Sequence, residues 1–324
     1  MRHTIILLLL SLLCCFSAPA AKPGNRSEAK IWHRYLDPPA DYSFEPSVRL
    51  VRKYSFEEFD AELLEQANGP ATVQRVLKVL PKNISGRLPA VVVPFYFPDA
   101  MIGFELDSRE PLPKYSHITM MADLARRGFV CISADSYHLT YVDSPRDRRD
   151  FSRWQLAGQA LVKDYPSWTG MGKLVADTRL LVDLLVEDQR VDARRIGIAG
   201  HSLGGKMAFY TGCLDSRIKV ILASDFGFLW EQSNWEKVWY WGETLQQMKA
   251  LGLNHTSLLS LSSGKPFMLI AGQYDDDRSY SAMTLARGYR RHPERLVILN
   301  HATGHRPPAY ALEAGYDFLE KYLK

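Results

Sequence analysis

Cysteine is scarce in this chain of 324 residues, which has four in all. Two of them lie in an apolar segment at the N-terminus, so only Cys131 and Cys213 remain for the rest of the chain. One pair cannot make the disulfide framework on which small secreted domains depend. Neither cysteine has a catalytic signature, and Cys131 stands in an apolar segment, where a thiol acts as a small hydrophobic side chain. We therefore expect two free thiols.

The chain also has neither a marked excess of one charge nor a long hydrophobic run. Lys and Arg number 40 against 36 Asp and Glu, and no basic stripe stands out along the sequence. This balance argues against a nucleic-acid partner. The N-terminal apolar run, of which residues 5–13 form the first part, is well short of the roughly 20 residues that a membrane-spanning helix needs.

The N-terminus has the organisation of a signal peptide. Arg2 precedes the apolar run, and residues 18–20 (Ala-Pro-Ala) supply the small residues typical of a signal peptidase site. We predict a signal peptide over residues 1–20, cleaved after Ala20 or Ala21, and a secreted or periplasmic protein with no integral membrane span after processing. The alternative is an uncleaved anchor.

The remaining chain is organised as one α/β domain. Residues 21–60 are polar and without clean periodicity, which predicts an N-terminal extension that packs across the domain. Over residues 61–324, apolar segments alternate with amphipathic ones, the pattern of a parallel sheet with crossover helices. The predicted strands cover 73–80, 90–97, 129–133, 195–199, 218–223, 266–271 and 295–299, and the main predicted helices cover 117–127, 174–185 and 309–322.

A nucleophile elbow is indicated where the strand at 195–199 runs into the sequence Gly-His-Ser-Leu-Gly. In a Gly-x-Ser-x-Gly motif between a strand and a helix, the turn is so tight that the serine side chain stands clear of its backbone. Gly200 and Gly204 flank Ser202 because a side chain at either place would collide with the neighbouring strand or helix. The N–H of Leu203 then lies at a helix N-terminus, where it favours a developing negative charge. Ser202 is the predicted nucleophile.

Two stretches interrupt the alternation, residues 143–169 and a lid-like insertion over about 226–262 that is rich in aromatic residues. Insertions at the C-terminal edge of a parallel sheet lie over the place where ligands bind. Aromatic side chains there can stack on sugar rings or aromatic acyl groups. Trp230, Trp235 and Trp239 are therefore the predicted substrate contacts, and the alternative is that these aromatics form the core of a lid.

The elbow and the order of elements resemble the α/β-hydrolase superfamily, in particular its dienelactone-hydrolase and acetylxylan-esterase-like branch. The resemblance covers roughly residues 73–323. It implies the α/β-hydrolase fold, with a mostly parallel central sheet flanked by helices and the aromatic insertion after the sixth strand. It also implies a catalytic triad in the chain order serine, acid, histidine, and such a reaction needs no metal or organic cofactor.

The base is therefore expected downstream of Ser202. A serine hydroxyl is a poor nucleophile near pH 7 and needs a base, usually a histidine oriented by a carboxylate. The resemblance places this histidine on the loop after the last strand, where both His301 and His305 lie. The preceding Thr-Gly makes His305 similar to the family's Gly-His ending. His305 is the predicted base and His301 the alternative.

The acid is expected after the strand at 266–271, where the chain reads Gly-Gln-Tyr-Asp-Asp-Asp. The family's Gly-x-x-Asp spacing selects Asp275. A slip in register would select Asp276 or Asp277, and some relatives keep the acid one strand earlier, where Asp225 lies. Asp275 is the predicted acid, with these three as alternatives. The oxygen-ligand spacing of a calcium loop is missing, and no metal site is predicted.

An oxyanion hole needs a second N–H donor besides Leu203. The resemblance places it in the loop after the strand at 90–97, where relatives carry a His-Gly type sequence. This chain instead reads Pro-Phe-Tyr-Phe there, with no glycine. Because proline has no N–H, the second donor must come from Phe95 or Tyr96.

Together these features predict a secreted serine esterase. Ser202 attacks an ester carbonyl while His305 accepts its proton, and water then hydrolyses the acyl-enzyme by the same route. Export and the aromatic insertion favour acetyl or feruloyl esters of polysaccharides, or another small-molecule ester. A serine peptidase of the same fold and a catalytically inactive binding protein are the competing hypotheses.

Overall fold

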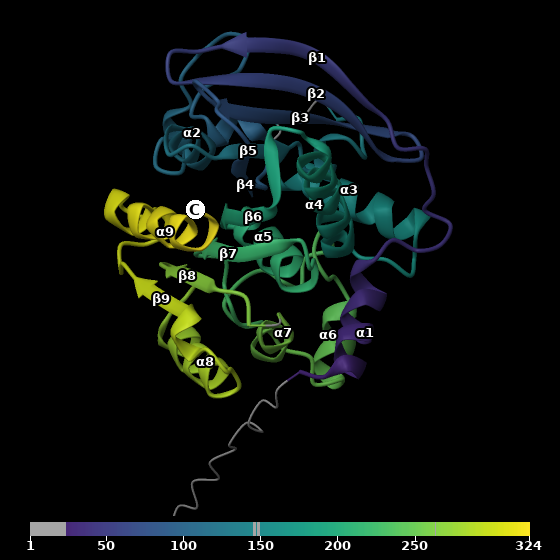
Figure 1. Ribbon diagram of the computed structural model, residues 1–324. Helices are drawn as coiled ribbons and strands as arrows, with labels where there is room; N and C mark the ends of the chain where they lie inside the picture. Colours follow the sequence, from purple (N-terminus) through teal and green to yellow (C-terminus); the bar gives the residue numbers. More distant parts are fainter. Residues whose placement is uncertain (1–23, 145–146, 148–149, 263) are drawn as a thin grey trace, which may run out of the picture.

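The computed structural model describes residues 24–324 except 145–146, 148–149 and 263 (Figure 1). The signal peptide predicted over residues 1–20 lies outside the described residues. Within the described part of the chain, no helix is both long enough and apolar enough to cross a membrane.

A single nine-stranded sheet runs through the described residues, in the order β1-β2-β3-β5-β4-β6-β7-β8-β9. The pairs β1-β2, β2-β3 and β3-β5 are antiparallel, and all pairs from β5 to β9 are parallel. This mostly parallel sheet confirms the predicted fold class. The strands are β1 (Val48–Ser55), β2 (Phe59–Gly69), β3 (Thr72–Pro81), β4 (Leu88–Val92), β5 (Val130–Ala134), β6 (Val191–His201), β7 (Ile218–Ser224), β8 (Phe267–Ala271) and β9 (Leu296–Asn300).

Helices cover both faces of the sheet (Figure 1). Strand residues alternate between two hydrophobic clusters: Ala90 and Val92 belong to one, and Val91 and Val93 to the other. A strand buried on both faces reads as a continuous apolar run, which is why β4 could be predicted. The helices are α1 (Arg26–Leu36), α2 (Met120–Arg126), α3 (Phe151–Asp164), α4 (Gly170–Glu187), α5 (Leu203–Leu214), α6 (Thr244–Ala250), α7 (His255–Leu261), α8 (Asp277–Gly288) and α9 (Ala309–Leu323).

The N-terminal extension is more regular than its sequence indicates. Helix α1 and strand β1 both lie within the predicted irregular segment, and β2 was not predicted either. Almost every residue of β1 is exposed, so the strand lacks the alternation that reveals a half-buried strand. Helix α1 is anchored by Trp32, which is fully buried and packs its ring against those of Tyr210 and Trp230. The extension therefore contributes to the core.

Candidate active site

Ser202 lies in a strained turn between β6 and α5. Its backbone has φ 56° and ψ −115°, a conformation that costs free energy for a residue with a Cβ and is concentrated at functional sites. A Cβ on Gly204 would lie 2.0 Å from the carbonyl oxygen of Pro94, and one on Gly200 would lie 2.2 Å from that of Gly204. Backbone contacts therefore require glycine on both sides of Ser202.

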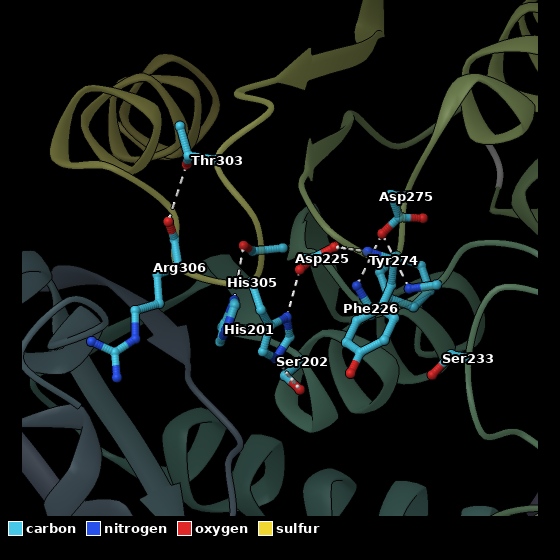
Figure 2. A network of polar contacts seen from close by, with 12 residues as sticks. His201, Ser202, Asp225, Phe226, Ser233, Tyr274, Asp275, Thr303, His305 and Arg306 are labelled. Atoms are coloured by element: carbon cyan, nitrogen blue, oxygen red, sulfur yellow. Dashed lines mark hydrogen bonds and ion pairs between the residues drawn. The ribbon is translucent and has the colours of Figure 1, made fainter. Parts of the chain in front are cut away.

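A chain of hydrogen bonds joins Ser202, His305 and Asp225 (Figure 2). His305, on the loop between β9 and α9, places Nε2 3.0 Å from Oγ of Ser202. Its Nδ1 lies 2.5 Å from Oδ2 of Asp225. Asp225 follows β7 and is fully buried, and its Oδ1 accepts a hydrogen bond from the N–H of Tyr274 at 2.7 Å. The three side chains have the arrangement of a catalytic triad, in the expected order along the chain.

Asp275, the predicted acid, does not contact His305. Its carboxylate is fully buried and accepts hydrogen bonds from the N–H groups of residues 226–228 and from the hydroxyl of Ser279. The prediction that Asp275 orients the histidine is therefore wrong, and Asp225, held as an alternative, occupies that position. The backbone conformation accounts for the difference between the two aspartates. Asp225 has φ 41°, and this left-handed turn at the end of β7 accompanies the contact of its carboxylate with His305.

The neighbouring aspartates have structural roles. Asp276 precedes α8, and its side chain accepts a hydrogen bond from the N–H of Arg278 at 2.9 Å, as an N-cap does. Asp277 is the first residue of α8. Neither is hydrogen-bonded to His305 in the described structure, whose ring contacts Asp225 instead.

His301, the alternative base, is buried away from the nucleophile. Its Nδ1 lies 2.7 Å from Oγ1 of Thr303. Its ring is close to Gly272, where a Cβ would lie 2.9 Å from Nε2 of the histidine. The geometry thus selects His305 as the histidine that contacts Ser202.

The loop after β4 adjoins the elbow, as the resemblance implies, but β4 ends at Val92 and not at residue 97. The hydroxyl of Ser136 donates to the carbonyl of Phe95 at 2.7 Å, and the N–H of Ser136 donates to the carbonyl of Tyr96 at 3.1 Å. In a trans peptide the C=O and N–H groups point in opposite directions. The bond to the Phe95 carbonyl therefore turns the N–H of Tyr96 away from Ser136.

A cavity of about 460 Å³ lies beside Ser202. Its walls combine aromatic and polar side chains, many of which the sequence did not single out. Besides Ser202, Asp225 and His305, the lining includes Phe95, Tyr96, Tyr115, Phe151, Tyr240 and Tyr274 among the aromatics, and Lys114, His117, His201, Lys206, Ser233, Asn234 and Arg306 among the polar residues.

The tryptophans predicted to contact substrate belong to the core. Trp230, Trp235 and Trp239 are at most 8% exposed, and among the described residues none of the three lines the cavity. The prediction of a tryptophan platform is therefore wrong, because these rings pack inside the insertion. Phe151 is different: it is 56% exposed, lines the cavity and stacks its ring on that of Trp239.

Three histidines, half-buried His117 and the buried His201 and His255, are held in the neutral form. Burial, together with the smaller effect of the positive charge of Arg306, lowers the pKa of His117 to about 4. Burial also lowers the pKa of His255 to about 3, although the Phe228 carbonyl acts in the opposite direction. Burial, followed by the charge of His305, places the pKa of His201 well below its ordinary value. All three are therefore uncharged near pH 7.

We expect the free energy of unfolding to decrease as the pH falls from about 6.5 toward 4. The unfolded chain then binds protons at these histidines while the folded chain does not, at a cost of up to about 1.4 kcal/mol per pH unit for each. Urea unfolding at a series of pH values measures this slope. His255→Gln should make the slope shallower, and an unchanged slope in that variant would contradict the prediction.

Comparison with known proteins shows similarity to hydrolases. Residues 75–223 match the dienelactone hydrolase family. YtaP of Bacillus subtilis (strain 168), which carries the provisional name of a hydrolase, is 24% identical over 190 residues, covering 55% of this chain and 61% of YtaP. The chain thus spans less than two thirds of the length of this curated relative.

Solved structures share the fold at low sequence identity. A CE15 glucuronoyl esterase from Teredinibacter turnerae T7901 has a TM-score of 0.66 and 16% identity, covering 92% of this chain and 84% of that one. Acetyl xylan esterase 1 from Thermoanaerobacterium sp. JW/SL YS485 has a TM-score of 0.56 and 15% identity, covering 92% and 94%. The chain therefore has the fold of these α/β-hydrolase esterases, and the predicted likeness to dienelactone hydrolases is confirmed over residues 75–223.

Proposed function

We propose that this protein is a serine esterase that cleaves carboxylic esters through an acyl-enzyme. The observation that carries the proposal is the hydrogen-bonded chain from Ser202 through His305 to Asp225. Oγ of Ser202 attacks the ester carbonyl carbon, and its proton passes to Nε2 of His305. The carboxylate of Asp225 stabilises the imidazolium that forms. His305 then gives the proton to the departing alcohol, and a water molecule releases the acid by the same sequence of steps.

The oxyanion of each tetrahedral intermediate is stabilised by two backbone N–H groups. The first is that of Leu203, at the N-terminus of α5, where the helix dipole adds to the effect. Tyr96 supplies the second, since Ser136 engages the carbonyl of Phe95 and so turns the N–H of Tyr96 away from itself. Burial raises the pKa of the Tyr96 phenol, which therefore stays protonated near neutral pH.

The substrate is an ester of a carbohydrate or of another small molecule. Structural neighbours of this chain are named a glucuronoyl esterase and an acetyl xylan esterase. The exposed ring of Phe151 offers an aromatic face at the cavity for a sugar or an aromatic acyl group. The N-terminal sequence supports export, so we place this activity outside the cytoplasm.

Hydrolysis of p-nitrophenyl acetate and labelling by a fluorophosphonate probe test the proposal. Both should occur in the mature protein and should be lost in Ser202→Ala, because the probe reacts with an activated serine. His305→Ala should lose hydrolysis, and His301→Ala serves as its matched control. Hydrolysis that persists in Ser202→Ala overturns the mechanism. Faster cleavage of a peptide anilide than of the ester favours a peptidase, and a parent protein with neither reaction favours a binding protein.

A further inference from the structure

Lys206 is an ammonium group buried beside Ser202. It lies in the first turn of α5, is 3% exposed and lines the cavity. Its Nζ donates to the carbonyl of Phe226 at 2.6 Å and to Oγ of Ser233 at 2.7 Å, and it lies 3.6 Å from the centre of the Trp235 ring. These partners are all uncharged. Among the described residues, no carboxylate forms an ion pair with Lys206.

Two physical effects oppose a positive charge at this position. Burial lowers the pKa of Lys206 to about 7, although the charges of Asp275 and Asp225 act in the opposite direction. The N-terminal turn of a helix also disfavours a cation, because the helix dipole is positive there. A methionine would occupy similar space without either cost. Near pH 7 the group is therefore close to the point of losing its charge, and a bound group of opposite charge would favour its ammonium form.

Apart from Asp225 of the triad, the remaining charges of the cavity have the same sign. Lys114 and Arg306 are exposed residues of its lining, and neither forms an ion pair with another described residue. Asp225 is the one carboxylate among the described lining residues, and both of its oxygens are engaged, by Tyr274 and His305. The cavity thus presents two exposed cations and the buried amino group of Lys206 to a substrate, and its one carboxylate has both oxygens engaged.

The wall next to Lys206 is suited to receive an anion. Ser233 accepts the hydrogen bond from Lys206 and donates to Oδ1 of Asn234 at 3.1 Å, which leaves the Asn234 amide N–H groups as donors on the cavity wall. A carboxylate held by the Asn234 amide N–H groups would be linked to the ammonium through Asn234 and Ser233 by a continuous chain of hydrogen bonds, which the low dielectric strengthens. Figure 2 shows Ser233 and Arg306 on opposite sides of Ser202.

We propose that the enzyme prefers esters that carry a free carboxylate, and that Lys206, acting through Ser233 and Asn234, determines this specificity. Lys114 and Arg306, which are exposed on the cavity lining, attract the anionic substrate toward the cavity. The inference rests on the proposed esterase function and names the substrate class of the same site.

Mono-p-nitrophenyl glutarate and p-nitrophenyl valerate test the proposal, since their acyl chains have the same number of carbons and differ in the terminal carboxylate. In the parent protein, kcat/KM should be about tenfold or more higher for the glutarate ester, as expected for a hydrogen bond to a charged group. Lys206→Met should abolish this ratio, mainly through KM for the charged ester. Lys237→Met is the matched control, because Lys237 lies in the insertion that Lys206 contacts but is 47% exposed and outside the cavity lining; its ratio should equal that of the parent.

Binding of free glutarate gives a second readout that does not depend on turnover. Glutarate should raise the Tm of the parent protein and should have a smaller effect on Asn234→Ala, which serves if Lys206→Met fails to fold. Equal kcat/KM for the two esters, with no stabilisation by glutarate, overturns the preference while leaving the esterase function intact. Failure to hydrolyse either ester or to label Ser202 refutes the proposed function instead, and the glutarate measurement then still decides whether the cavity binds a carboxylate.

Discussion

Asp225→Asn is expected to lower kcat/KM for ester hydrolysis by about 10,000-fold. In the native protein Oδ2 of Asp225 lies 2.5 Å from Nδ1 of His305 and so keeps the proton of the neutral imidazole on Nδ1, leaving Nε2 free to accept one from Ser202. An asparagine has nearly the same shape but no negative charge. Its amide can favour the wrong tautomer of His305, and it does not stabilise the imidazolium.

The measurement is kcat/KM for p-nitrophenyl acetate together with thermal unfolding, so that a loss of activity is separated from a loss of folded protein. Asp276→Asn is the matched control, because Asp276 lies in the neighbouring run of aspartates and caps α8. This control should retain most of the activity. If folded Asp225→Asn retained most of the activity, the assignment of Asp225 as the acid would be contradicted.

The elbow could be predicted because its determinants are local. The tight turn at Ser202 and the close approach of backbone to Gly200 and Gly204 are properties of a few consecutive residues. His305 could be predicted for a related reason, since the loop after β9 must pass near the C-terminal ends of the other parallel strands.

The acid could not be selected in the same way, because two strand ends offer carboxylates at comparable positions. Asp225 follows β7 and Asp275 follows β8, and both strands belong to the same parallel edge. Which of them contacts His305 depends on the backbone conformation of each loop, and the positive φ of Asp225 has no signature in its own sequence.

The tryptophans illustrate a different difficulty. A cluster of aromatic residues has the same composition whether it packs inside an insertion or projects over a site. Trp235 is fully buried, and its indole N–H donates to the carbonyl of Gly227 at 3.0 Å, a contact that only the folded loop provides. The exposed Phe151 could not be predicted to line the cavity, because it follows a charged segment with no motif that relates it to the site.

The two carboxylates hold the loops after β7 and β8 together in a reciprocal manner. Asp225, on the first loop, accepts from the N–H of Tyr274 on the second. Asp275, on the second loop, accepts from the N–H groups of residues 226–228 on the first. Each loop therefore supplies a carboxylate to the backbone of the other, and Asp275 supports the segment that begins one residue after Asp225.

Asp275→Ala is expected to lower the free energy of unfolding by about 3 kcal/mol, because it leaves buried N–H groups without an acceptor. Burial raises the pKa of Asp275, while the N–H of Phe228 and the hydroxyl of Ser279 act in the opposite direction, so part of the lost hydrogen bonding is offset by the relief of a buried charge. Urea unfolding near neutral pH gives the value. Asp276→Ala is the control and should cost only about 1 kcal/mol, the usual effect of removing a helix N-cap. Equal losses of unfolding free energy in the two variants would mean that Asp275 does not hold the loops together. An unchanged kcat in folded Asp275→Ala would mean that the position of Asp225 does not depend on Asp275.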